Sequence, residues 1–293
     1  MRGELVTVIT DDGLELQGLY CLPACKPTLA ILHVHGLAGN FYENRFVASV
    51  GGEAMERGAA FLTVNTRGHD YVTDILRDVG GKQDYVSGGG AHELLEDSLY
   101  DLEAWCRFLR SEGLGDIVLE GHSTGAVKVV HYSAQLEGLA PKGLILLSPS
   151  DDIGVQKAKL GSRYEEVLAT AGAQIERGLG DQMMPDEAFE YPVSARTYVD
   201  LFGVSSLNGI LDLGALGAED GLLSAIDSPV LVLFGTEAEA IPVSPAEYLE
   251  VLTRALCSSD VSTAIVAGAP HNYLGFETEV ASIVGAWIDG LLK

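Results

Sequence analysis

The sequence predicts an α/β protein with a mostly parallel sheet of about eight strands and helices on both of its faces. Two observations support this prediction. Short apolar runs bounded by turn residues recur along the chain, and parallel strands that are buried on both faces have such sequences. Helical patterns separate these runs, which favours parallel strand–helix–strand units with right-handed crossovers.

The expected strands begin with an antiparallel hairpin. Residues 6–10 and 14–20 are rich in β-branched or alternating apolar residues, and they flank the turn signal Asp11-Asp12-Gly13. The later apolar runs have the length of buried strands and cover 28–34, 59–64, 116–119, 143–147, 229–234 and 262–266. Together with the hairpin, these runs account for the predicted sheet.

Helices are expected over 42–57, 93–110 and 276–292. The clearest pattern is in 93–110, where apolar residues recur at spacings of three and four and form one stripe that faces a sheet. These residues are Leu95, Leu99, Leu102, Cys106 and Leu109. Segment 42–57 is weaker, because Gly51 and Gly52 each cost about 1 kcal/mol relative to alanine in a helix.

Two segments interrupt this alternation. Residues 70–90 end in a run of glycines and form a longer connection than a strand–helix loop needs, so we expect either a mobile lid or a packed excursion over the site. Residues 150–227 are helical and acidic without a convincing strand, and we expect a helical cap over the carboxyl edge of the sheet. The predicted organisation is therefore a core of residues 1–149 and 228–293 with a cap of residues 150–227.

The composition limits the partners of the protein. The formal net charge is −24, which argues against nucleic acid or an anionic membrane surface, because phosphate contacts need clustered lysine and arginine. No segment has the pattern of a secretion signal or the roughly 18 apolar residues of a membrane span, so we expect a cytoplasmic protein. The four scattered cysteines are expected to be reduced. The sequence does not indicate an oligomeric state.

The most specific motif is Gly121-His122-Ser123-Thr124-Gly125, which follows the apolar run 116–119 and precedes a helical segment. This pattern is typical of a nucleophile elbow, in which a serine lies on a sharp turn between a strand and a helix. Small residues two positions on either side allow that turn. The turn also leaves the Thr124 N–H at the start of a helix, where it is suited to bind an oxyanion.

A second loop at the same sheet edge follows the expected strand 28–34, in the sequence His35-Gly36-Leu37. Glycine lets the backbone approach a substrate, and we predict that the Leu37 N–H is the second oxyanion donor. An alternative is a metal site formed by His33 and His35 with His69 and Asp70. We favour a site without a metal, because the serine elbow gives a complete account that needs none.

A serine hydroxyl needs a base within hydrogen-bond reach to act as a nucleophile near neutral pH. His271 is the best candidate among the histidines, because it directly follows the last expected strand and precedes the last expected helix. That position places it on a loop at the same sheet edge as Ser123, with the serine before the histidine in the chain.

With these motifs in place, the chain resembles the α/β-hydrolase superfamily over essentially its whole length. The resemblance rests on His35-Gly36-Leu37, 65–69, 121–125, 234–242 and His271. The glycine-rich run 88–93 also resembles a poorly characterised subgroup of serine hydrolases. The resemblance implies esterase, lipase, thioesterase, lactonase or C–C-bond hydrolase chemistry with no cofactor.

One position departs from the family pattern. An aspartate that orients the histidine commonly follows the glycine after the penultimate strand by three residues, and here that position is Ala238. Three explanations remain open. The acid is a neighbouring glutamate, with Glu239 ranked ahead of Glu237; it is Asp151 or Asp152 after the preceding strand; or the serine and histidine work without an acid.

We therefore predict a serine hydrolase that cleaves a small to medium carboxylic ester, thioester or lactone with an uncharged or cationic body. The predicted catalytic residues are Ser123, His271 and Glu239, with the N–H groups of Leu37 and Thr124 as the oxyanion hole. An acyltransferase with the same acyl-enzyme is one alternative. The other is a catalytically degenerate binding module, which the absence of the usual acid at Ala238 would explain.

Overall fold

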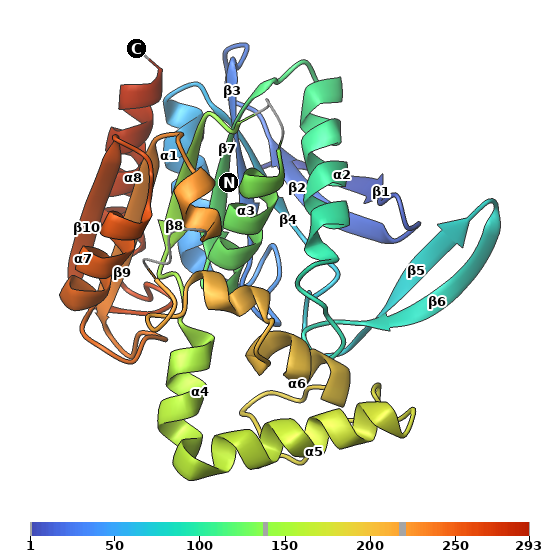
Figure 1. Ribbon diagram of the computed structural model, residues 1–293. Coiled ribbons are helices and arrows are strands. Elements are labelled where there is room, and N and C mark those ends of the chain that lie inside the picture. Colours follow the sequence, from blue (N-terminus) through green and yellow to red (C-terminus); the bar gives the residue numbers. More distant parts are fainter. Residues whose placement is uncertain (1, 137–139, 217–220, 293) are drawn as a thin grey trace.

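The computed structural model describes residues 2–136, 140–216 and 221–292. Within these residues the chain forms an eight-stranded sheet in the order β1-β2-β4-β3-β7-β8-β9-β10. β1 pairs antiparallel with β2, and β2 pairs antiparallel with β4, whereas all later pairs are parallel. The prediction of a mostly parallel α/β sheet that opens with an antiparallel hairpin is confirmed (Figure 1).

Each predicted apolar run lies on a strand of this sheet. The strands are β1 (Glu4–Ile9), β2 (Glu15–Cys21), β3 (Leu29–Val34), β4 (Ala60–Val64), β7 (Asp116–His122), β8 (Gly143–Leu147), β9 (Val230–Glu237) and β10 (Val261–Pro270). All residues of β3, β4 and β8 are buried, because helices cover both faces of the sheet. The carboxyl ends of the parallel strands meet at one edge, which is where such folds place their ligands.

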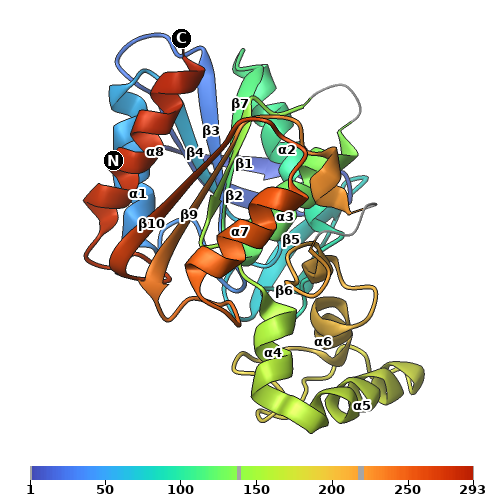
Figure 2. The ribbon, with the colours of Figure 1, turned by 60° about the vertical axis from the view of Figure 1, so that its left-hand side comes forward.

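Helices on the two faces create two apolar cores. α1 (Arg45–Glu56) and α8 (Glu277–Leu291) lie side by side over one face (Figures 1 and 2). α2 (Ser98–Ser111), α3 (Thr124–Gln135) and α7 (Pro245–Ala255) cover the other. Alternate residues of the strands therefore enter different cores, as β3 shows: Leu29 and Ile31 pack in the first, and Ala30 and Leu32 in the second.

The helix expected over 93–110 begins only at Ser98. Tertiary contacts hold the preceding residues in turns. The Glu93 carboxylate lies 2.5 Å from the Lys128 ammonium group, and the Leu95 N–H donates to Asp200 (2.8 Å). The rest of the predicted stripe is correct, and its neighbour Trp105 is fully buried.

The glycine-rich segment 70–90 forms two strands that the sequence did not predict. β5 (Thr73–Val79) and β6 (Lys82–Gly88) pair antiparallel around Gly80 and Gly81, both of which have positive φ angles. This hairpin projects away from the main sheet (Figure 1). It was missed because its strands carry mostly polar and charged residues, and only Ile75 is a buried apolar residue within them.

Between β8 and β9 the chain forms a run of short helices. They are α4 (Asp152–Leu160), η1 (Gly161–Arg163), α5 (Tyr164–Glu176), α6 (Ala195–Phe202), η2 (Leu207–Ile210) and η3 (Leu222–Ala225). α4, α5 and α6 lie beyond one end of the sheet (Figures 1 and 2). The division of the chain into a core and a cap stays a prediction. Across the three described ranges, no helix has both the length and the apolar character that a membrane crossing requires.

Candidate active site

Ser123 lies on the turn between β7 and α3 and has a strained backbone, with φ 57° and ψ −130°. Two glycines make this turn sterically accessible. A Cβ atom on Gly121 would lie 2.3 Å from the Gly125 carbonyl oxygen, and one on Gly125 would lie 2.4 Å from the Val34 carbonyl oxygen. A non-glycine residue with positive φ persists only where its surroundings enforce it, and such residues concentrate at functional sites. The local geometry is that of a nucleophile elbow.

His271 follows β10 and contacts a carboxylate. Its Nδ1 atom lies 2.8 Å from Oε2 of Glu239, whose side chain is only 4% exposed. The other carboxylate oxygen, Oε1, accepts hydrogen bonds from the Gly235 N–H (2.6 Å) and the Ser148 hydroxyl (2.9 Å). Ser148 Oγ also lies 2.7 Å from the buried hydroxyl of Tyr273. The Glu239 carboxylate is thus fixed on one side by the protein and presents its other oxygen to the imidazole.

The remaining candidate acids have other hydrogen-bond partners. Asp151 caps α4, where its side chain accepts from the N–H groups of Gly154 (2.7 Å) and Leu213 (3.0 Å). Asp152 accepts from hydroxyl groups beside Ser123, and Glu237 accepts from the Thr236 hydroxyl. Of the four carboxylates proposed from the sequence, only Glu239 contacts His271 through a hydrogen bond between described residues.

The backbone around Leu37 approaches the serine closely. A Cβ atom on Gly36 would lie 2.8 Å from the Ser123 Cβ atom, so glycine is needed there. His35 Nδ1 lies 2.7 Å from the Gly36 carbonyl oxygen, and its Nε2 accepts from the Thr66 N–H (3.1 Å). The proton of this neutral imidazole therefore lies on Nδ1, which donates to Gly36. Because the C=O and N–H groups of a trans peptide point in opposite directions, this bond orients the Leu37 N–H away from the His35 ring.

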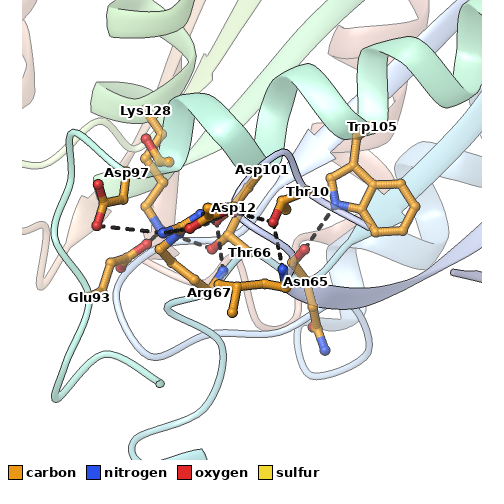
Figure 3. Close-up of polar contacts among 12 residues, drawn as sticks. Thr10, Asp12, Asn65, Thr66, Arg67, Glu93, Asp97, Asp101, Trp105 and Lys128 are labelled. Atoms are coloured by element: carbon orange, nitrogen blue, oxygen red, sulfur yellow. Dashed lines mark hydrogen bonds and ion pairs between the residues drawn. The ribbon is translucent and has the colours of Figure 1, made fainter. Parts of the chain in front are cut away.

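A polar network lies next to that histidine, and Figure 3 shows its members Thr66, Glu93 and Lys128. The Lys128 ammonium group pairs with Glu93 and donates to Thr66 Oγ1 (3.2 Å), and Thr66 in turn contacts His35. Burial holds the pKa of His35 well below its usual range, and the nearby Lys128 charge adds to this effect. The His35 ring is therefore neutral, as its hydrogen bonds require.

Arg67 forms a second part of the network. Its guanidinium group lies 2.8 Å from Asp101, 3.0 Å from Asp12 and 3.5 Å from Asp97. Asp101 also accepts from the Arg67 N–H (2.8 Å). These contacts connect the loop after β4 to the first hairpin and to α2, and the Arg67 side chain is only 9% exposed.

His122 joins the elbow to the histidine loop. Its Nε2 atom lies 2.9 Å from the His271 carbonyl oxygen, and the two ring centroids are 4.9 Å apart. Burial lowers the pKa of His122 well below its usual range, and the neighbouring His271 lowers it further. His122 is therefore neutral, and its Nε2–H donates to the carbonyl group of His271.

Two adjoining cavities, of about 380 and 240 Å³, meet at Ser123 and His271. Leu37, Tyr191 and Ala238 line both of them. The larger, which we name the outer lobe, extends to residues that include Glu43, Tyr71 and Asn272. The smaller, which we name the inner lobe, extends to α4 and residues 189–191 and includes Asp152 and Phe189. The predicted site residues Ser123, His271, Leu37 and Thr124 are brought together, and Glu239 stands directly behind His271.

The histidines considered as metal ligands have separate partners. His33 Nδ1 lies 2.7 Å from Glu120 inside the sheet, His35 Nδ1 donates to the Gly36 carbonyl group, and His69 contacts Asp70 (3.0 Å). Among the residues that the structure describes, no group of three or more histidine, cysteine or acidic side chains is placed to hold a metal ion.

Sequence reasoning missed several supporting residues. Ser148 and Tyr273 lie far from Glu239 along the chain, and nothing in the sequence relates them to it. The pairing of Lys128 with Glu93 was also missed, because a lysine within an apolar helix has no pattern that identifies its partner. Ala238, next to Glu239, has a positive φ angle (52°), and this too had no sequence signal.

The fold and the arrangement of these residues define an α/β-hydrolase fold. The chain belongs to the family described as "Protein of unknown function (DUF1749)", whose model matches residues 85–282. The sequence matches none of the curated proteins.

Several solved structures share this fold along nearly the whole chain. Est1E from Butyrivibrio proteoclasticus, solved with ferulic acid, is 20% identical with a TM-score of 0.67 and covers 98% of this chain and 99% of its own. The siderophore hydrolase EstB from Aspergillus fumigatus is 15% identical with a TM-score of 0.72 and covers 99% and 98%. A soluble variant of the monoglyceride lipase from Saccharomyces cerevisiae is 14% identical with a TM-score of 0.66 and covers 99% and 96%. At these identities the likeness establishes the fold.

Proposed function

We propose that the protein is a serine hydrolase that cleaves a small to medium carboxylic ester, thioester or lactone. The observation that carries this proposal is the 2.8 Å contact between Glu239 and His271, beside a cavity that also contains Ser123. In this proposal Glu239 supplies the carboxylate that the family pattern would place at position 238, where this chain has an alanine. A degenerate binding module would not need a buried acid fixed in this way. The solved structures with the same fold include esterases and lipases, which also supports the proposal.

In the proposed reaction, His271 removes the proton from Ser123 Oγ as the oxygen attacks the substrate carbonyl carbon. The N–H groups of Leu37 and Thr124 stabilise the negative charge that develops on the carbonyl oxygen. Glu239 holds the proton of His271 on Nδ1, so that Nε2 is free to accept the serine proton. His271 then protonates the leaving group. Water, activated by the same histidine, hydrolyses the acyl-enzyme.

The test is labelling with a small fluorophosphonate, followed by mass spectrometry of the peptides. We expect modification at Ser123, because this reagent reacts with a serine that is activated by a base. The label should be lost in Ser123→Ala and should fall by at least about a hundredfold in rate in His271→Ala. His92→Ala is the matched control, because His92 lines neither lobe. A protein that is not labelled, under conditions where a known serine hydrolase reacts, would refute the proposal.

Hydrolysis of esters, thioesters and lactones of increasing acyl length would then define the substrate class. Release of product should show a burst when deacylation is slow. If product formation accelerated mainly with an added alcohol, amine or thiol, the acyltransferase alternative would replace the hydrolase.

A further inference from the structure

The inner lobe contains a carboxylate that the proposed reaction does not use. Asp152, the first residue of α4, lines this lobe together with Ser123 and His271. Its Oδ2 atom accepts hydrogen bonds from the hydroxyl groups of Thr124 (3.1 Å) and Ser150 (3.0 Å). From the described residues, no donor forms a hydrogen bond with Oδ1 and no cationic side chain forms an ion pair with this carboxylate. This carboxyl group of the lobe therefore has no ion-pair partner among the described residues.

Among the other ionisable groups that line the inner lobe, His271 lowers the pKa of Asp152 and Glu190 raises it. Lys159 and Glu190 also line this lobe, but their charged atoms lie 3.6 Å apart and both side chains are about half exposed or more, at 48% and 60%. They pair with each other at the rim, where such a pair contributes little. Burial raises the pKa of Asp152 from its ordinary value, which is the expected cost of a carboxylate without a counter-ion.

Aromatic rings share the lobe with this carboxylate. Phe189 and Tyr191 both line it and pack edge to face with ring centroids 5.4 Å apart. Tyr71 extends the aromatic wall toward the outer lobe, with its ring centroid 5.5 Å from that of Tyr191. A carboxylate combined with aromatic faces is the chemistry that recognises ammonium groups, including alkylated ones.

We propose that the inner lobe binds an ammonium group of the substrate and that Asp152 determines this specificity. The inference rests on the proposed hydrolase function and narrows it: the protein prefers esters that carry a cation over neutral esters of the same shape. The cation belongs either to the acyl group or to the alcohol group, because both lobes reach Ser123 and His271. The aromatic residues add attraction for the cation but do not replace the carboxylate.

The test uses two pairs of esters in which a trimethylammonium group is replaced by a tert-butyl group. On the alcohol side the pair is acetylcholine and 3,3-dimethylbutyl acetate. On the acyl side it is phenyl 4-(trimethylammonio)butanoate and phenyl 5,5-dimethylhexanoate. In one of the pairs we expect kcat/KM to be at least about tenfold higher for the cationic ester than for the neutral one. The attraction between the ammonium group and a partly desolvated carboxylate should outweigh the cost of desolvating both groups by the free energy that corresponds to this factor.

Asp152→Asn is the decisive variant, because it removes the charge while keeping the shape and an oxygen that accepts from hydroxyl groups. It should abolish most of the preference for the cation and change kcat/KM of the neutral ester by less than about threefold. Glu187→Gln is the control, because this exposed glutamate lies in the same part of the chain but lines neither lobe. It should leave the ratio between the two esters unchanged within about twofold.

A measurement on the unmodified protein covers the case in which Asp152→Asn does not fold. Choline should slow the fluorophosphonate labelling of Ser123 at a lower concentration than 3,3-dimethylbutan-1-ol, its neutral counterpart.

Equal protection by the two alcohols, together with equal hydrolysis within both ester pairs, would overturn the inference and leave the hydrolase function intact. The inference would also be overturned if Asp152→Asn lowered kcat equally for cationic and neutral esters, because Asp152 would then stabilise the His271 imidazolium. Failure of Ser123 labelling and of all four hydrolyses would overturn the hydrolase function and, with it, this inference.

Discussion

Replacement of Glu239 by glutamine tests the geometry of the site most directly. The two carboxylate oxygens have different surroundings: Oε1 accepts from the Gly235 N–H at 2.6 Å, and Oε2 faces His271 Nδ1 at 2.8 Å. A backbone N–H can only donate, so the amide oxygen of a glutamine must occupy the Oε1 position. The amide NH₂ group then faces His271, and the imidazole must accept with Nδ1. Its proton is consequently forced onto Nε2, where it prevents removal of the serine proton.

The expected loss in kcat is about 10⁴-fold, the size found when the equivalent replacement in a serine protease imposes the wrong tautomer. That factor corresponds to about 5.4 kcal/mol of transition-state stabilisation. The assays are ester hydrolysis under saturating substrate and the rate of fluorophosphonate labelling of Ser123. The free energy of unfolding should change far less than the activity, since Gly235 and Ser148 retain an acceptor.

Glu237→Gln is the matched control, because this glutamate lies two residues away and is exposed. Its activity should remain within about twofold of the unmodified protein. If Glu239→Gln kept activity within about tenfold, the Glu239–His271 contact would not be the orienting interaction. The site would then work as a serine–histidine dyad, and the tautomer argument would be wrong.

Two further predictions concern stability. Lys128→Met should lower the free energy of unfolding, measured by urea denaturation, by about 3 to 5 kcal/mol, because it leaves the buried carboxylate of Glu93 without its counter-ion. Adding Glu93→Gln to this variant should restore most of the lost stability. An equal loss in the single and the double variant would contradict this prediction. Burial raises the pKa of Asp200 to about 6, so its contribution to stability is complete below its ordinary pKa of 3.8 and is lost as the pH rises through about 6. The free energy of unfolding of the unmodified protein, relative to that of Asp200→Asn, should therefore fall by about 1.4 kcal/mol between pH 5 and pH 8. This pH range avoids the isoelectric point near 4.4. A difference between the two proteins that does not change with pH would show that the pKa of Asp200 is not raised.

The fold could be predicted from the sequence because its main signals are local. Strands such as β3 and β8 are short apolar runs between turn residues, and their burial on both faces follows from that composition. The hairpin β5–β6 could not be predicted in the same way. Its strands bury little, so their sequence shows neither alternation nor a continuous apolar run. The start of α2 was misplaced because contacts with Lys128 and Asp200, distant in the sequence, override the local helical pattern.

The candidate site was predictable where chemistry demands a backbone shape. The sequence predicts that Ser123 and Leu37 belong to the site, because close approach and a strained turn require glycines at fixed positions and those glycines are visible in the sequence. The supporting groups were not predictable, because a hydrogen bond to Glu239 from Ser148 leaves no trace in the spacing of residues. Asp152 was considered only as an acid for His271. Its lack of a counter-ion in the inner lobe is a property of the assembled site.

The position of Glu239 shows how the spacing of residues in a family pattern and the geometry of the site can differ. In the proposed reaction His271 requires a fixed carboxylate oxygen near Nδ1, and residues at different positions along the chain can supply it. Here the chain after β9 passes through a positive φ angle at Ala238, and the carboxylate comes from the next residue, whose side chain has one more methylene group than an aspartate. A longer side chain has more rotamers to lose, so it needs additional contacts to be held in one position. The hydrogen bonds from Gly235 and Ser148 provide them. The alanine at the usual acid position is therefore compatible with an intact orienting contact, and the loss of an aspartate from the family frame does not by itself indicate a loss of catalysis.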